Sequence, residues 1–283
     1  MTEKATEPAA ATKRDTDSQP KLIEDQIVER EHHVTIGGVP LDYKSVVGTM
    51  VQKDHDEDKP KANIFFMAYF KQGVEKPAER PLIISFNGGP GSSSVWLHLG
   101  MLGPRRVVSG DVDNPVPPPS RLIDNEHSLL DVADMVFIDP VSTGYSRPVP
   151  GEEAKQFHGL EPDIESVGEF IRIFVSRYNR WLSPKFLIGE SYGTTRAAGL
   201  AGHLQDRHGL YLNGLALISV VLDFQTLIFA ENNELPYVLF LPSYAATAWY
   251  HGRLGDEFAG DLRGLLDDCL LYTSDAADDF AVV

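Results

Sequence analysis

Short apolar runs alternate with longer amphipathic stretches along most of the chain. Three β-rich runs come first, and Gly37-Gly38 separates the first two, so they predict an antiparallel hairpin with a neighbouring strand. The later runs are short and largely apolar, which is typical of strands that are buried on both faces of a parallel sheet. The predicted strands cover residues 32–36, 41–51, 64–70, 81–86, 135–138, 186–188 and 215–221.

Helices are predicted between the apolar runs. The clearest spans residues 163–182, where apolar residues recur at spacings of three and four, and Pro184 ends it. Its apolar stripe consists of Ile164, Val167, Ile171, Phe174, Tyr178 and Trp181. A second helix is expected over 192–208, and a shorter one after residues 92–94. Strands that alternate with helices behind an antiparallel hairpin predict an α/β fold with a doubly wound, mostly parallel sheet.

Composition narrows the classes of function. The 283 residues include 42% hydrophobic ones, enough to bury the core of one large domain, and the formal net charge is -16. Such an acidic chain repels phosphate backbones, so no nucleic-acid partner is expected. The most apolar run, 215–222, is far shorter than the ~20 residues that cross a bilayer, so no membrane partner is expected. Cys269 is the single cysteine, which excludes an internal disulfide framework.

The start of the chain and its polar clusters carry no assigned chemistry. Residues 1–28 have charges and small side chains but no apolar core of a secretory signal, so they are expected to form a disordered leader. As written, this start indicates a cytoplasmic protein. If a signal peptide was lost from the sequence, the protein is expected to be periplasmic or secreted. The acidic loop at 54–58 lacks the glycine and terminal glutamate of an EF-hand. No metal and no cofactor are expected.

One short motif carries the candidate chemistry. The residues GESYG at 189–193 fit the G-x-S-x-G nucleophile elbow, in which a sharp strand-to-helix turn presents a serine hydroxyl above a sheet. The motif follows the strand-like residues 185–188 and precedes a predicted helix, which is the context that an elbow requires. The alternative is a serine that only caps an ordinary helix. Because the flanking strand and helix fit the elbow, Ser191 is the candidate nucleophile.

A glycine-rich loop upstream offers backbone N–H groups for an oxyanion. Residues 86–94 read FNGGPGSSS and follow a predicted strand. In α/β hydrolases one donor comes from such a loop and the other from the residue after the nucleophile, here Gly89 and Tyr192. A phosphate-binding loop fits less well, because Pro90 lacks an N–H and no Gly-Lys-Ser/Thr follows. A plain turn is the remaining alternative.

Three motifs in combination resemble the serine carboxypeptidase family. They are NGGPGSSS at 87–94, FIDP at 137–140 with TGYS at 143–146, and GESYG at 189–193. The resemblance covers roughly residues 34–226 and implies an α/β-hydrolase fold. It also implies release of C-terminal residues from peptides through an acyl-enzyme. Ser92 stands where many relatives have a disulfide cysteine, which indicates a bacterial-like branch without disulfides.

The resemblance implies a role for individual positions. It gives Ser191 as the nucleophile, Gly89 and Tyr192 as oxyanion donors, and Asn87, Gly88 and Glu190 as substrate-binding residues. The family's second acidic residue, which shares a proton with the one before the nucleophile, aligns with Met101, so that pair is broken. The alternative is therefore an esterase, or an acyltransferase that passes the acyl group to another acceptor.

The histidine base and its orienting carboxylate are not found downstream of Ser191, where the α/β-hydrolase order places them. His203 and His208 follow on the same predicted helix, roughly 18 and 25 Å away at 1.5 Å per residue, and are out of reach. His251 has no convincing aspartate before it. The chain is therefore expected to be a C-terminally truncated fragment that lacks the triad Asp and His and is inactive by itself.

Four segments are expected along the chain. After the leader at 1–28, the resemblance implies a partial α/β-hydrolase domain at 29–228 and the start of a helical cap at 229–268. Residues 269–283 show neither a helical nor a strand period and are expected to be an artefactual tail. An esterase or acyltransferase and a non-catalytic scaffold stay open beside the carboxypeptidase. The expected partner is a peptide or ester substrate, and the oligomeric state is left open.

Overall fold

The computed structural model describes residues 23–54, 58–111, 113–258 and 260–279, with side chains up to residue 270. Most of the expected leader and the last residues of the expected tail lie outside this part. Contacts divide the described chain into two compact units, which meet between Val220 and Val221 in the sequence. Each unit is described by itself.

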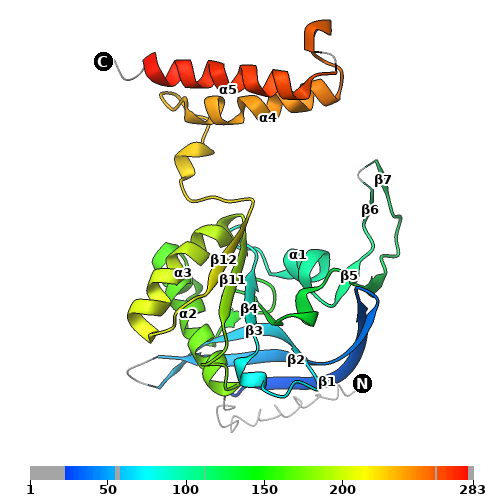
Figure 1. Cartoon of the computed structure of the whole chain (residues 1–283). Coiled ribbons are helices and arrows are strands. Elements are labelled where there is room, and N and C mark those ends of the chain that lie inside the picture. Colours follow the sequence, from blue (N-terminus) through cyan, green and yellow to red (C-terminus); the bar gives the residue numbers. More distant parts are fainter. Residues whose placement is uncertain (1–22, 55–57, 112, 259, 280–283) are drawn as a thin grey trace, which may run out of the picture. The chain divides into compact units, whose positions relative to one another are not determined.

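The first unit is built on one mixed sheet (Figure 1). Its strands are β1 (Gln26–Ile36), β2 (Val39–Lys53), β3 (Pro60–Lys71), β4 (Leu82–Phe86), β9 (Asp134–Ile138), β11 (Lys185–Glu190) and β12 (Gly214–Ile218), with β10 (Arg147–Pro148) paired to β3. Their order in space is β1-β2-β3-β9-β4-β11-β12. The first three pair antiparallel, and β9, β4, β11 and β12 are parallel to one another. The predicted hairpin, its neighbour and the parallel strands are therefore confirmed.

Two strands differ from their predicted form. β1 begins at Gln26, inside the span expected as leader, because it pairs with β2 along its whole length. The predicted run at 215–221 forms a strand only up to Ile218, and its residues are exposed or half-buried rather than buried on both faces. The reason is its position: β12 is last in the sheet order and pairs with β11 alone among the described strands.

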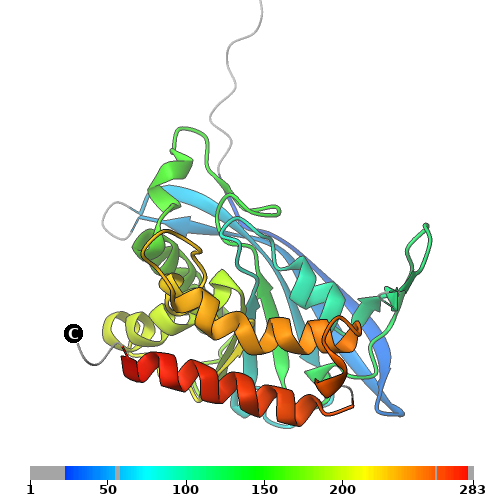
Figure 2. The same cartoon turned by 90° about the horizontal axis from the view of Figure 1, so that it is seen from above.

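Helices lie on both faces of the sheet (Figures 1 and 2). On one face are α2 (Leu160–Arg177) and α3 (Tyr192–His208), and on the other is the short α1 (Val95–Leu97), which continues as the π-helical turn η2 (His98–Leu102). One buried core joins the sheet to α2 and α3, and a second lies on the side of α1 and η2. The doubly wound α/β architecture predicted from the sequence is confirmed.

The helix α2 ends earlier than the sequence predicts. The apolar period continues to residue 182, but α2 ends at Arg177 because Asn179 adopts a left-handed conformation with φ of 53°. Trp181 therefore leaves the apolar stripe and is 43% exposed. In contrast, α3 spans the predicted residues, and Gly209, with φ of 63°, closes it.

Shorter elements connect these strands and helices. A ribbon of β5 (Arg105–Val107) and β8 (Leu122–Asp124) follows η2, and β6 (Gly110–Asp111) pairs with β7 (Asn114–Pro115) at its tip. The 3-10 turns η1 (Pro77–Glu79), η3 (Leu129–Asp131) and η4 (Ala154–Phe157) precede β4, β9 and α2. Figure 1 shows the β6–β7 tip projecting from the rest of the first unit.

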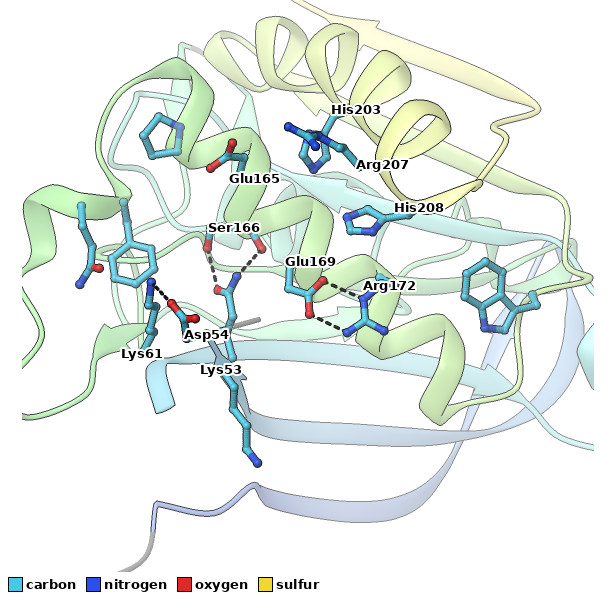
Figure 3. Close-up of a pocket in the computed structure, with 15 residues that line it drawn as sticks. Lys53, Asp54, Lys61, Glu165, Ser166, Glu169, Arg172, His203, Arg207 and His208 are labelled. Atoms are coloured by element: carbon cyan, nitrogen blue, oxygen red, sulfur yellow. Dashed lines mark hydrogen bonds and ion pairs between the residues drawn. The ribbon is translucent and has the colours of Figure 1, made fainter. Parts of the chain in front are cut away.

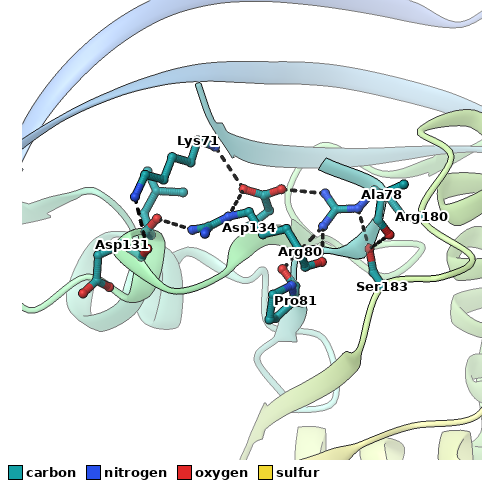
Figure 4. Close-up of polar contacts among 9 residues, drawn as sticks. Lys71, Ala78, Arg80, Pro81, Asp131, Asp134, Arg180 and Ser183 are labelled. Atoms are coloured by element: carbon teal, nitrogen blue, oxygen red, sulfur yellow. Dashed lines mark hydrogen bonds and ion pairs between the residues drawn. The ribbon is translucent and has the colours of Figure 1, made fainter. Parts of the chain in front are cut away.

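Buried charges fix the amino ends of the parallel strands (Figure 4). Asp134, the first residue of β9, accepts hydrogen bonds from Arg180 Nη1 at 2.6 Å and from Arg80 Nε at 3.0 Å. Arg180 is 2% exposed and also donates to the Arg80 carbonyl before β4 and to Ser183 Oγ before β11. The cluster therefore ties together the amino ends of β4, β9 and β11, opposite to the ends that carry the candidate site.

The second unit is helical. It contains η5 (Phe224–Thr226), α4 (Leu235–Tyr250), η6 (Asp256–Phe258) and α5 (Leu262–Asp279). The helices α4 and α5 pack against each other, and Trp249 Nε1 donates to the Phe258 carbonyl at 2.9 Å. Residues 269–279, for which the sequence shows no period, continue α5, whose start is capped by Asp261 through the N–H of Gly264. None of the described helices is long and apolar enough to span a bilayer.

Candidate active site

Ser191 occupies the sharp turn between β11 and α3. Its backbone angles, φ of 57° and ψ of -125°, fall in a region that L-residues rarely adopt and that costs about 1–3 kcal/mol. The Ser191 N–H donates to the Ile218 carbonyl at 2.9 Å, and the N–H of Thr194 donates to the Ser191 carbonyl at 2.9 Å. The structure therefore places this serine at the carboxyl end of β11, in the strand–turn–helix context that the sequence predicts.

The glycines of the turn are required by close packing. A Cβ added at Gly189 would lie 2.1 Å from the carbonyl oxygen of Gly193, and one added at Gly193 would lie 2.9 Å from the carbonyl oxygen of Phe86. Real Cβ atoms essentially never approach backbone so closely. The G-x-S-x-G spacing thus allows β11 and α3 to meet within one tight turn next to the end of β4.

The glycine-rich loop after β4 lies directly against this turn. A Cβ on Gly88 would lie 2.4 Å from the backbone nitrogens of Tyr192 and Gly193, so glycine alone permits the approach. Gly89 has φ of 104°, a conformation that favours glycine. Neither the Gly89 N–H nor the Tyr192 N–H donates a hydrogen bond to another described residue. Tyr192 is the first residue of α3, where helix N–H groups have no intrahelical partner.

Asn87 joins three elements at the site. Its side chain is 1% exposed and donates from Nδ2 to Glu190 Oε2 at 2.9 Å. Its Oδ1 accepts from the Leu97 N–H at 2.9 Å, in α1. The end of β4, the end of β11 and the helix α1 are therefore held together by one amide, and Asn87, Gly88, Gly89, Glu190, Ser191 and Tyr192 are brought together as the sequence predicts.

Arg196 lies beneath the site and was not among the site residues predicted from the sequence. It is 1% exposed, donates from Nε to Asp163 Oδ2 at 2.7 Å and from Nη1 to the Asn87 carbonyl at 2.8 Å. Its guanidinium carbon lies 5.2 Å from the Phe86 ring centroid and 5.3 Å from that of Tyr192. Arg196 lies on the buried side of α3 with Ala197 and Leu200. A charged residue on this side of the predicted helix was the sequence signal that could have identified it.

Asp139, from the second family motif, anchors the loop that precedes α1. Its Oδ1 accepts from the Ser94 N–H at 2.9 Å, and its Oδ2 accepts from the Tyr145 N–H at 3.2 Å. Burial raises the pKa of this carboxyl, and the two backbone N–H groups act in the opposite direction. Gly144 is required beside it, because an added Cβ would lie 1.7 Å from Asp139 Oδ2.

A cavity of about 700 Å³ opens above Ser191. The residues that line it are Asn87, Gly89, Ser92, Trp96, Leu97, Gly100, Met101, Glu190, Ser191 and Ile218. Met101 is 51% exposed and lines this cavity together with Glu190, at the position where the sequence resemblance implies a second acidic residue. Among the described residues, no histidine or second carboxylate lines it.

The downstream histidines lie elsewhere. His203 and His208 line a separate cavity of about 890 Å³ between α2, α3 and the ends of β2 and β3 (Figure 3), with ring centroids 5.3 Å apart. Burial lowers the pKa of both imidazoles. His251 follows α4 in the second unit.

His98, which precedes Ser191 in the sequence, is 4% exposed and bonded to Tyr69 Oη at 2.6 Å. Within the described ranges, no cluster of three metal-binding side chains occurs.

Comparison with known proteins identifies relatives of the chain. The sequence profile described as serine carboxypeptidase matches residues 43–257. The chain is 28% identical over 211 residues to serine carboxypeptidase S10 family member 1 of Dictyostelium discoideum, across 74% of this chain and 45% of that protein. It is 28% identical over 210 residues to serine carboxypeptidase-like 46 of Arabidopsis thaliana, across 71% and 39%. The chain thus spans less than half the length of these two relatives.

A solved structure shares the fold. A prohormone-processing carboxypeptidase from Saccharomyces cerevisiae matches with a TM-score of 0.50 and 22% identity, across 85% of this chain and 56% of that one. This likeness supports the α/β-hydrolase fold implied by the motifs. Because the family profile covers most of the chain, including the glycine-rich loop and the elbow, the chain belongs to the serine carboxypeptidase family.

Proposed function

We propose that the protein is a serine-type carboxypeptidase, which releases C-terminal residues from peptides through an acyl-enzyme on Ser191. The observation that carries the proposal is the strained Ser191 beside the bonded pair of Asn87 and Glu190, all facing one cavity. Family membership supports the reaction class. A strained nucleophile turn is retained only where the surrounding structure enforces it, and here three packed glycines do so.

The backbone N–H groups of Gly89 and Tyr192 are the proposed oxyanion donors. They lie on the two loops that Gly88 brings into contact, and neither is used in a hydrogen bond with another described residue. Donors that are fixed before the reaction stabilise the negative charge of a tetrahedral intermediate without reorganisation, and loss of one lowers kcat by about 10²–10³. Arg196 holds the carbonyl of Asn87 and thereby supports this arrangement as a positioning residue.

Asn87, Gly88 and Glu190 are the proposed recognition site for the substrate's terminal carboxylate. The Asn87 amide donates hydrogen bonds, and Glu190 bonds to a second carboxylate only if one proton is shared between them. Peptides would then bind with the C-terminal residue in the cavity lined by Trp96 and Met101. The scissile carbonyl would lie next to Ser191.

The reaction requires a general base. We assign the base and its orienting carboxylate to the part of the family's length that this chain does not span, because no histidine among the described residues lines the Ser191 cavity. The base takes the Ser191 proton while Oγ bonds to the carbonyl carbon. The C–N bond then breaks and the proton passes to the leaving amine. Water hydrolyses the resulting ester and restores Ser191.

An esterase or acyltransferase of the same fold is the second candidate. The observation that favours it is Met101, which lies in the cavity where the family's second acidic residue is expected. Without a partner to share a proton, recognition of a terminal carboxylate by Glu190 weakens. A substrate without that carboxylate would then react equally well.

A Glu190→Gln variant of the full-length protein separates the two candidates. The substrates are an N-blocked dipeptide with a free carboxylate and the ethyl ester of the same N-blocked amino acid. For a carboxypeptidase, we expect kcat/KM for the dipeptide to fall about 10- to 100-fold, the range for losing a bond to a charged group, and ester hydrolysis to stay within about twofold. Glu153→Gln, which changes an exposed residue, is the matched control. Equal loss on both substrates, or ester hydrolysis alone in the unaltered protein, favours the second candidate.

A further inference from the structure

A third cavity, of about 780 Å³, shares no lining residue with the cavity above Ser191. Its floor is one face of the antiparallel part of the sheet, as the strand register shows. Arg30, Ser45 and Tyr69 lie side by side on β1, β2 and β3. One step along the same face, Val47 pairs with Met67, which pairs with Phe137 on β9. Successive strands therefore contribute to a single continuous surface.

The turn η2 and the β5–β8 ribbon form the walls of this cavity. His98 comes from η2, and Arg105 and Leu122 come from the ribbon. The opposite face of the same strands is covered by α2, whose Phe170 and Phe174 pack on Phe66. On the cavity side Val47 and Met67 are only half-buried. Volumes of about 300–1,000 Å³ with an apolar lining and a few polar groups are typical of small-molecule sites.

Several of the polar side chains that line the cavity already have partners. Tyr69 Oη lies 2.6 Å from His98 Nε2, and Asp139 accepts from two backbone N–H groups. Arg105 pairs with Asp124 at 3.2 Å. Arg30 differs: its side chain donates to the Glu29 carbonyl, and no carboxylate among the described residues lies within ion-pair distance of it. An apolar surface beside a cation that lacks a counter-charge matches an anion with an apolar body.

We propose that this cavity binds an apolar small molecule that carries one carboxylate, such as a medium-chain fatty acid. The apolar chain packs on Val47, Met67 and Phe137, and the carboxylate accepts hydrogen bonds from the Arg30 guanidinium. The proposal does not depend on the reaction at Ser191, because the two cavities are lined by different residues.

Calorimetric titration of the chain with decanoate below its micellar concentration tests the proposal. We expect saturable binding of one decanoate per chain. Decanol, which has the same apolar body without the charge, should bind about tenfold more weakly, because a charge-assisted hydrogen bond is lost. Arg30→Gln should weaken decanoate binding about tenfold and leave decanol binding within about twofold.

Two matched substitutions locate the site. Met67→Trp fills the proposed cavity and should abolish binding of both ligands, whereas Met101→Trp fills the cavity above Ser191 and should change neither. Three results would overturn the proposal. They are loss of binding in Met101→Trp but not in Met67→Trp, an unchanged decanoate affinity in Arg30→Gln, and decanoate uptake that does not saturate. If Met67→Trp does not fold, a photoreactive decanoate decides the matter. Crosslinks to residues that line this cavity support the site, and crosslinks confined to residues outside its lining refute it.

Discussion

Around Ser191, three glycines pack so closely that no side chain fits at their Cα atoms. Gly88, Gly189 and Gly193 belong to motifs that are visible in the sequence, so the tight turn at Ser191 and the loop packed against it could be predicted from spacing. Arg196 could not be assigned, because its bond to the Asn87 carbonyl joins residues far apart in the sequence. Local motifs thus predict the turn, whereas the buried charge that supports it appears only in the folded chain.

Close packing predicts opposite effects for two glycine substitutions. Gly189→Ala places a Cβ 2.1 Å from a backbone oxygen, so we expect a loss of about 1–3 kcal/mol in the free energy of unfolding. Gly202→Ala, in α3 with open space around it, should stabilise by about 0.5–1 kcal/mol through helix propensity. Urea unfolding measures both. Equal effects in the two variants would contradict the packing argument.

Burial of His98 makes the free energy of unfolding depend on pH. Burial lowers its pKa from 6.5 to about 4, so between these values the unfolded chain binds the proton and the folded chain does not. The free energy of unfolding is therefore not reduced by His98 above pH 6.5. As the pH falls from 6.5 towards 4, protonation of His98 in the unfolded chain lowers this free energy by up to about 3 kcal/mol.

Unfolding free energies at pH 7 and pH 4.5 measure this effect. The difference between the two pH values should shrink in His98→Gln and stay unchanged in His127→Gln, whose imidazole is exposed. A His98→Gln variant with the same pH dependence as the unaltered protein would show that His98 is not kept neutral by burial.

At the element scale, the sequence predicts most strands and α3 because their periods are regular and their ends carry turn residues. The end of α2 was predicted too late, since the apolar spacing continues to Trp181 although Asn179 turns the chain. The β5–β8 ribbon was not predicted, because its strands are very short and exposed or half-buried. Hydrophobic periodicity carries little information for elements that bury so little surface.

The cluster around Asp134 predicts a large effect at this scale. Asp134→Asn leaves Arg180, which is 2% exposed, without its counter-charge, so we expect a loss of about 3–5 kcal/mol in the free energy of unfolding. Glu79→Gln removes only an exposed pair with Lys76 and should change stability by less than about 1 kcal/mol. Chemical denaturation compares the two. Similar small effects would mean that the cluster does not hold the strand ends.

At the scale of the whole molecule, the chain consists of a sheet-based unit and a helical unit. The candidate site residues belong to the first unit, and their placement follows from the carboxyl ends of β4 and β11 lying next to each other. The sequence predicted this arrangement through the family motifs. It could not predict that residues 269–279 continue α5, because this stretch has no apolar period.

Limited proteolysis tests the division into units. Residues 221–234 carry exposed apolar side chains, among them Phe224, Leu227 and Phe229, which chymotrypsin cleaves after. We expect early cleavage within 221–234 to release a resistant fragment that contains Ser191 and keeps its cooperative thermal transition. First cuts distributed through α2 or α3 would contradict the division.

Covalent labelling of the full-length protein tests whether Ser191 is the nucleophile of a serine carboxypeptidase. A fluorophosphonate is added while release of the C-terminal residue from an N-blocked dipeptide is followed, and the labelled residue is identified by mass spectrometry. We expect one label per chain, on Ser191, with loss of peptide release in proportion to labelling. A label on a different serine, or peptide release that persists in a Ser191→Ala variant, would contradict it.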